Sequence, residues 1–130
     1  MNFQSTRLLK WDGLGGFLSF LCLIHCLILP WMAALLPITL WLDESAHVWL
    51  FYALVPAAAL AGWNGFREHS QVLPIILMCA GIVLVGLGAF LPMSIALETV
   101  LTVAGSLLLV AGHIINGRLT LIHRIVMQHA

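Results

Sequence analysis

Charged side chains are scarce in this sequence. Of its 130 residues, five are Lys or Arg and five are Asp or Glu, which makes 8% charged residues against 62% hydrophobic ones. A soluble domain is about a quarter charged and about half apolar, so an ordinary soluble domain is excluded. The formal net charge is zero and the five basic residues form no patch. We therefore expect no nucleic acid partner.

Other features that the sequence lacks exclude further classes of function. The sequence contains no glycine-rich phosphate-binding loop ending in Gly-Lys-Ser or Gly-Lys-Thr, so this chain alone does not drive pumping with ATP. We expect neither an enzymatic activity nor a tightly bound cofactor. No internal repeat, low-complexity tract or linker divides the sequence, which predicts one domain over residues 1–130.

The most informative feature that is present is a set of four uncharged stretches, at Gly13–Leu42, Ser45–Phe66, His69–Leu97 and Thr99–Gly117. Each has about the 20 residues, or more, that cross about 30 Å of hydrocarbon as a helix. They lack the polar stripe of a soluble helix and the alternation of a membrane barrel strand. The sequence therefore predicts an all-α, polytopic protein of the lipid bilayer. Its bundle of four transmembrane helices should cover residues of about 12–40, 46–67, 72–92 and 96–117.

The distribution of charge predicts an orientation. All five basic residues fall in segments that can lie on the same side of the membrane. They are Arg7, Lys10, Arg67, Arg118 and Arg124. The opposite loops contain Asp43, Glu44 and Glu98 and no basic residue. Because short cytoplasmic loops are enriched in Lys and Arg, we expect both termini in the cytoplasm.

The first stretch carries two thiols on one face. Cys22 and Cys26 are one helical turn apart, so their Cβ atoms should lie about 5–6 Å from each other. At 100° per residue, Ser19 and Asp12 fall on the same side, and His25 lies beside the thiols. Thiolate and imidazole together suit soft or borderline metal ions. We therefore expect Cys22, His25 and Cys26 to contact a metal ion; the alternative is that both cysteines pack as small hydrophobic side chains.

The last stretch also has a polar face. Glu98, Thr102, Ser106, His113 and Asn116 share an arc of roughly 100° on a helical projection. Such a stripe faces the bundle interior or an aqueous path, or forms hydrogen bonds that only fix the packing. An Asp12–His113 contact between the first and fourth helices is expected. The candidate pathway residues are Asp12, Ser19, His69, Glu98, His113 and Asn116.

Glycines at several positions predict closely packed helices. Gly81 and Gly88 lie in the third stretch, and Gly105 and Gly112 lie in the fourth. Small residues of this kind let the backbones of membrane helices approach each other.

The pattern Cys22-x-x-His25-Cys26-x-x-x-Pro30, preceded by Asp12 and Ser19, resembles the MerC-type family of mercuric-ion transport proteins. The resemblance covers nearly the whole chain. It implies a four-helix protein of the bacterial inner membrane that takes Hg(II) into the cell, with Cys22 and Cys26 as its metal contacts. Mercury-resistance members of that family have adjacent cysteines in the first helix and a cysteine pair in the tail. Here three residues separate the thiols, and residues 118–130 contain no cysteine.

Three functional readings follow from these residues. The first is a carrier or channel for a transported metal ion, Hg(II) by resemblance or Zn(II) by the chemistry of one His and two Cys. The second is a non-transporting membrane assembly or sensor subunit. The third, haem binding, is disfavoured because His25 and His113 should lie at different depths. The sequence is also compatible with assembly into a homo-oligomer.

Overall fold

The computed structural model describes residues 13–14, 16–18, 20–21, 24 and 45–129. The described residues between 13 and 24, which we call the first segment, are helical. Three complete helices follow: α2 at Ser45–His69, α3 at Leu73–Phe90 and α4 at Ile95–His129. No strand occurs in the described part of the chain, so its architecture is all-helical as predicted. Most of the predicted first helix, residues 12–40, lies outside the described residues.

The helix ends follow from local chemistry. Ser70 adopts a left-handed backbone conformation with φ of 55° and ends α2, where its N–H donates to the carbonyl of Phe66 at 2.8 Å. This is a common way to satisfy the last carbonyls of a helix. Leu91 is extended, with ψ of 132°, because the following Pro92 disfavours a helical conformation. The observed bounds of α2 and α3 lie within two residues of the predicted ones.

The end of α4 corrects the prediction. The charges at Arg118 and Arg124 suggested that the helix ends at about residue 117, but it continues to His129. No proline and no glycine follows Gly117, so nothing interrupts the backbone hydrogen bonds. Charge marks where the apolar run stops, and it does not mark where the helix stops.

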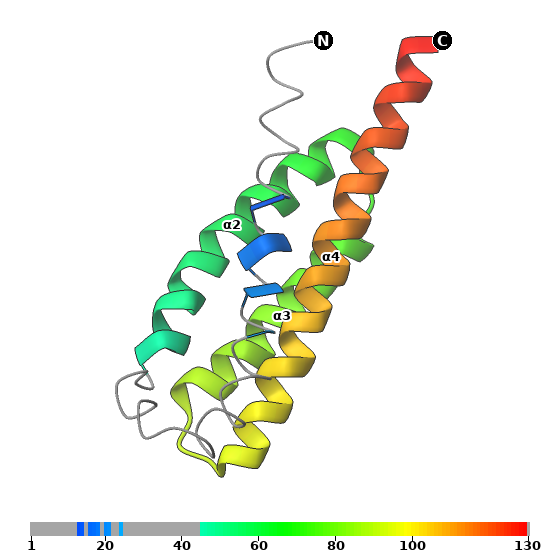
Figure 1. The fold of residues 1–130 in the computed structure, drawn as a ribbon. Helices are drawn as coiled ribbons and strands as arrows, with labels where there is room; N and C mark the ends of the chain where they lie inside the picture. The colour runs from blue at the N-terminus through cyan, green and yellow to red at the C-terminus, as the bar shows by residue number, and fades with distance from the viewer. Residues whose placement is uncertain (1–12, 15, 19, 22–23, 25–44, 130) are drawn as a thin grey trace.

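The three complete helices form a bundle in which α3 runs antiparallel to both α2 and α4 (Figure 1). The backbones of α3 and α4 approach each other closely at glycines. A Cβ on Gly81 would lie 2.7 Å from the carbonyl oxygen of Gly105, and a Cβ on Gly105 would lie 2.8 Å from that of Gly81. A Cβ on Gly112 would meet the Met78 side chain at 2.9 Å. The predicted role of these glycines in close packing is confirmed.

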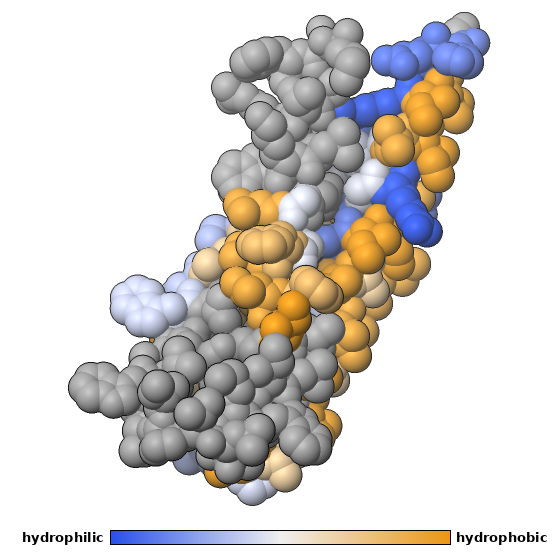
Figure 2. All heavy atoms as spheres, viewed as in Figure 1, coloured by the Kyte–Doolittle hydropathy of each residue, from blue (hydrophilic) through white to orange (hydrophobic). Residues whose placement is uncertain are grey.

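The hydrophobic core lies where these helices meet. Its buried members come from all three complete helices and are Leu54, Ala58, Ala61, Met78, Val85 and Leu109. Leu18 of the first segment packs against this core. Apolar residues also cover the outside. Figure 2 shows hydrophobic surface along α4, with hydrophilic residues gathered toward its C-terminal end. Within the described residues, α3 and α4 are long and apolar enough to cross a membrane.

The glycine contact generates a stability prediction. We expect Gly81→Val to lower the melting temperature of the detergent-solubilised protein, because the added side chain would collide with the backbone of α4. Overpacking of this kind costs about 1–3 kcal/mol or more. Ala80→Val is the matched control, since Ala80 is the neighbouring residue of α3 and is exposed. Equal melting temperatures for the two variants would contradict the assigned contact.

Candidate functional site

The polar face of α4 is buried in the bundle. Five of its polar residues are at most 2% exposed: Thr102, Ser106, His113, Asn116 and Thr120. The prediction that this arc faces the interior is therefore correct for the first four. Thr120 was missed because the helix was expected to end before it. Its position, seven residues after His113, would have placed it on the same line.

The hydroxyl groups of this face fall into two kinds. Thr102 donates to the carbonyl oxygens of Glu98 at 2.9 Å and Thr99 at 3.2 Å, so its polar group is satisfied within its own helix. The hydroxyls of Ser106 and Thr120 have no hydrogen-bond partner among the described residues. Since a buried hydroxyl normally has a partner, these two differ from Thr102.

His113 lies where α4 meets the first segment. A Cβ on Gly16 would be 3.8 Å from the Cβ of His113. A groove of about 400 Å³ opens beside this contact, lined by Gly13, Gly16, Phe17, His113, Ile114, Gly117, Arg118 and Leu121. Asp12 lies outside the described residues, so the Asp12–His113 contact remains a prediction.

Two of the predicted pathway residues, His69 and Asn116, are in direct contact. Nδ1 of His69 accepts a hydrogen bond from the backbone N–H of Gln71 at 3.0 Å. The ring proton therefore lies on Nε2, which donates to Oδ1 of Asn116 at 3.1 Å. The Asn116 amide nitrogen donates in turn to the carbonyl of Ala61 at 3.1 Å. A Cβ on Gly65 would overlap the Asn116 carboxamide, so glycine is needed there.

A second pair joins the same ends of α2 and α4. Nε of Arg124 donates to Oε1 of Glu68 at 2.8 Å, and the two side chains are 18% and 31% exposed. Sequence analysis missed this pair because it predicted that the last helix ends at about residue 117, before Arg124. The pair and the His69–Asn116 bond together fix the end of α2 against α4.

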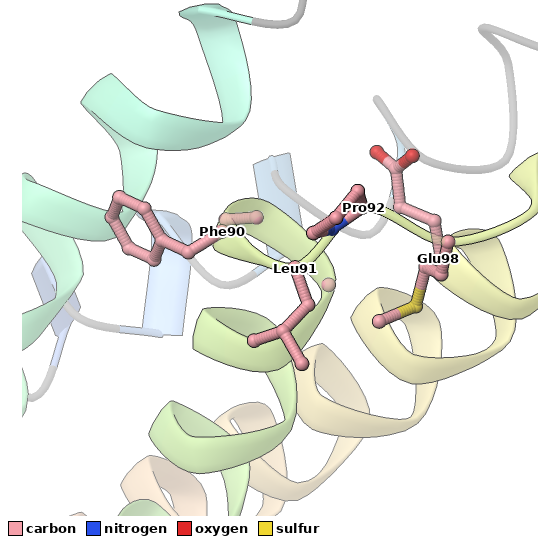
Figure 3. A pocket seen from close by; sticks show the side chains of 7 residues that line it. Phe90, Leu91, Pro92 and Glu98 are labelled. Atoms are coloured by element: carbon pink, nitrogen blue, oxygen red, sulfur yellow. The ribbon is translucent and has the colours of Figure 1, made fainter.

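Glu98 lies far from the other described pathway candidates, His69, His113 and Asn116. It is half-buried at the start of α4, where it lines a pocket of about 380 Å³ with the end of α3. Figure 3 shows Glu98 beside Pro92 of the α3–α4 turn. Fifteen residues separate it from His113, which is about 22 Å along the helix. The structure therefore places Glu98 at the opposite end of the bundle from His69 and Asn116.

The predicted metal ligands Cys22, His25 and Cys26 lie outside the described residues, as does Ser19. Among the residues that the structure describes, no group of three His, Cys, Asp or Glu side chains could hold a metal ion. Cys79 is a free, exposed cysteine on α3.

The comparison with protein families decides the broader class. The family described as MerC mercury resistance protein matches residues 12–118. The chain belongs to the MerC mercury resistance family. No curated protein and no solved structure matches it. As a MerC-family protein with apolar helices long enough to cross a membrane, it is a membrane protein of mercury resistance with a transport-related role.

The contact between His69 and Asn116 generates the second prediction. Asn116→Ala should lower the free energy of unfolding by about 1–3 kcal/mol, because buried hydrogen-bonding groups lose their partner. In a double-mutant cycle, His69→Ala and Asn116→Ala should show a coupling of about 0.5–1.5 kcal/mol. The measurement is denaturant unfolding in detergent.

His123 supplies the control for this cycle. It lies on α4 and is exposed, so His123→Ala should combine additively with Asn116→Ala. A coupling in the control cycle equal to that of His69 would show that the measured energy does not come from the hydrogen bond.

Proposed function

We propose that this MerC-family protein is a multi-pass carrier of the bacterial inner membrane that takes mercuric ion into the cytoplasm. In this proposal the first segment and α2 join α3 and α4 as four transmembrane helices, with both termini cytoplasmic. The observation that carries it is the buried polar face of α4, with His113 against the first segment. Polar groups inside a membrane protein are costly, and they mark substrate pathways.

The arrangement of charge supports the orientation. Arg67 is in the last turn of α2, and Arg124 pairs with Glu68 beside it. Glu98 lies at the other end of the bundle, at the turn between α3 and α4. Basic residues at one end and an acidic residue at the other agree with a cytoplasmic location for the Arg67 end. The length of α2, 25 residues, corresponds to about 37 Å and is sufficient to cross the membrane.

The chemistry assigned to the first helix is ligand exchange at sulfur. The thiols of Cys22 and Cys26 displace the ligands with which Hg(II) arrives, and each thiol releases its proton to solvent as its Hg–S bond forms. The metal keeps its oxidation state throughout. His25 is the third donor, and so small a ligand set permits release of the ion toward His113 and Asp12. The same Cys2His set also suits Zn(II), which is the second candidate substrate.

A non-transporting assembly or sensor subunit is the alternative function. It would use the same polar faces to bind a partner, and it requires no metal exchange at Cys22 and Cys26. Metal accumulation in cells distinguishes the two functions, since a non-transporting subunit leaves the metal content of the cells unchanged.

The third prediction tests transport. Cells expressing the wild-type protein should accumulate more Hg than cells with an empty vector, and the Cys22→Ser/Cys26→Ser variant should lose that excess because both sulfur ligands are gone. Elemental analysis of washed cells measures Hg, Zn, Cu and Cd together, which also identifies the preferred metal.

Cys79→Ser is the matched control, because Cys79 is the third cysteine of the sequence, is exposed on α3 and is not a ligand in this proposal. It should accumulate metal like the wild type. Equal accumulation of all four metals by the wild type and the double variant, at equal protein levels in the membrane, would reject transport and favour the subunit function.

A further inference from the structure

The turn between α3 and α4 forms a pocket at the opposite end of the bundle from His69 and Asn116. Its volume is about 380 Å³, and it is lined by residues 88–93 and by Glu98. All of these residues belong to the described part of the chain. Figure 3 shows the Glu98 carboxylate and Pro92 at this turn. In the proposed orientation this end faces the outside of the cell, so the pocket lies where an ion would enter.

Two side chains that line this pocket can act as metal ligands. Met93 has a thioether sulfur, and Glu98 has a carboxylate. Both residues are half-buried, whereas every other residue from Leu91 to Leu97 is exposed. The turn therefore shelters a soft donor and places it in the same pocket as a negative charge.

The end of α3 adds backbone oxygens to the pocket. The N–H of Leu91, the residue that follows α3, donates to the carbonyl of Leu87 at 3.1 Å. The next carbonyl, that of Gly88, would need an N–H at position 92, where Pro92 has none. Carbonyl oxygens at the C-terminus of a helix also carry partial negative charge. The α3 side of the pocket therefore presents acceptors that attract a cation.

The start of α4 does not present a matching set of free donors. The Oγ of Ser94 accepts from the N–H of Leu97 at 3.4 Å, and the carbonyl of Ser94 accepts from the N–H of Glu98 at 3.0 Å. Two of the first N–H groups of α4 are thus engaged within the helix start. In the sequence, Glu98 is also the only charged residue between Glu68 and Arg118. The polar groups at this turn therefore favour a cation over an anion.

Contacts with two helices hold the pocket in shape. A Cβ on Gly88 would lie 2.6 Å from Cγ2 of Thr102 and 3.4 Å from the carbonyl oxygen of Glu98, so the last turn of α3 lies against the first turns of α4. Phe90 packs edge to face against Phe51 of α2, with ring centroids 5.2 Å apart. A site that is already formed spends less free energy on ordering when a ligand binds.

We propose that this pocket is an outer loading site for the mercuric ion, in which the Met93 sulfur and the Glu98 carboxylate bind the metal before it reaches the thiols of the first helix. The identity of the ion rests on the proposed function. Thioether sulfur suits soft metal ions, and the carboxylate and the α3 carbonyls attract positive charge. A thioether has no proton to release, so binding here is ligand exchange alone. One neutral sulfur holds the ion weakly enough to pass it on.

Both residues also have simpler roles that the experiments must distinguish. A carboxylate near the start of a helix stabilises that helix end, and methionine fills irregular gaps between helices. Either role predicts that a substitution changes stability and leaves metal binding unchanged.

Mercury binding by a cysteine-free protein tests the site without any requirement for transport. The variant Cys22→Ser/Cys26→Ser/Cys79→Ser removes all three cysteines, and in detergent it should still bind Hg(II) during equilibrium dialysis against mercuric nitrate. In that background, Met93→Leu and Glu98→Gln should each weaken the affinity by about tenfold or more, as loss of a group that supports a metal site does. Circular dichroism and the melting temperature establish that the variants are folded.

Met127 and Glu68 supply the matched controls. Met127 is an exposed methionine near the other end of α4, and Glu68 is the acidic residue that pairs with Arg124. Met127→Leu and Glu68→Gln should bind Hg(II) like the cysteine-free parent. The proposal is overturned if the parent does not bind, if Met93→Leu or Glu98→Gln keeps the parent's affinity, or if the controls lose as much affinity as these two variants.

Uptake kinetics test the loading role in protein that keeps its cysteines. Met93→Leu should raise the external Hg(II) concentration that gives half-maximal initial uptake, in proportion to its loss of affinity. The maximal rate should stay unchanged, because a saturating concentration compensates for weaker capture. An unchanged half-saturating concentration would overturn the loading role.

The outcomes separate this inference from the proposed function. Weaker binding in Met93→Leu together with normal uptake by Cys22→Ser/Cys26→Ser would reject transport through the thiols and leave the pocket as a mercury site. Loss of uptake in Cys22→Ser/Cys26→Ser together with unchanged binding and uptake in Met93→Leu would reject the loading site and leave the proposed function intact.

Discussion

The backbone contact between α3 and α4 fixes the arrangement on which the rest of the structure depends. Gly81 and Gly105 lie against each other with no room for a side chain on either. In lipid, apolar side chains gain little by leaving their surroundings, so close packing of small residues is a main source of helix association. The contact also sets the rotation of α4 about its axis. That rotation places the line through His113 toward the first segment.

Asn116 performs a related task between α2 and α4. Its carboxamide accepts from His69 and donates to Ala61, so one side chain satisfies two groups of α2. Gly65 provides the space for it. Because buried polar groups without partners are costly, this arrangement favours one register between the two helices. The Glu68–Arg124 pair, about two turns further along α4, joins the same two helices.

Sequence reasoning recovered the features that depend on local composition. Uncharged stretches located α2 and α3, and helical projection identified the buried face that holds Thr102, Ser106, His113 and Asn116. It did not find the His69–Asn116 bond, because a bond between residues 47 positions apart depends on how two helices are rotated and shifted. Because the predicted end of α4 lay too early in the sequence, both Thr120 and the Glu68–Arg124 pair were missed. The thiol site of the first helix remains a prediction.

The continuous course of α4 links the protein to the thickness of its bilayer. Its 35 residues correspond to about 52 Å, against about 30 Å of hydrocarbon. A helix longer than the membrane tilts, or extends into water at its ends. Glu68 and Arg124 join the far end of α4 to α2, so any tilt that the lipids impose is shared by both helices. The groove beside His113 has residues of α4 along one wall, so a change in the tilt of α4 moves that wall.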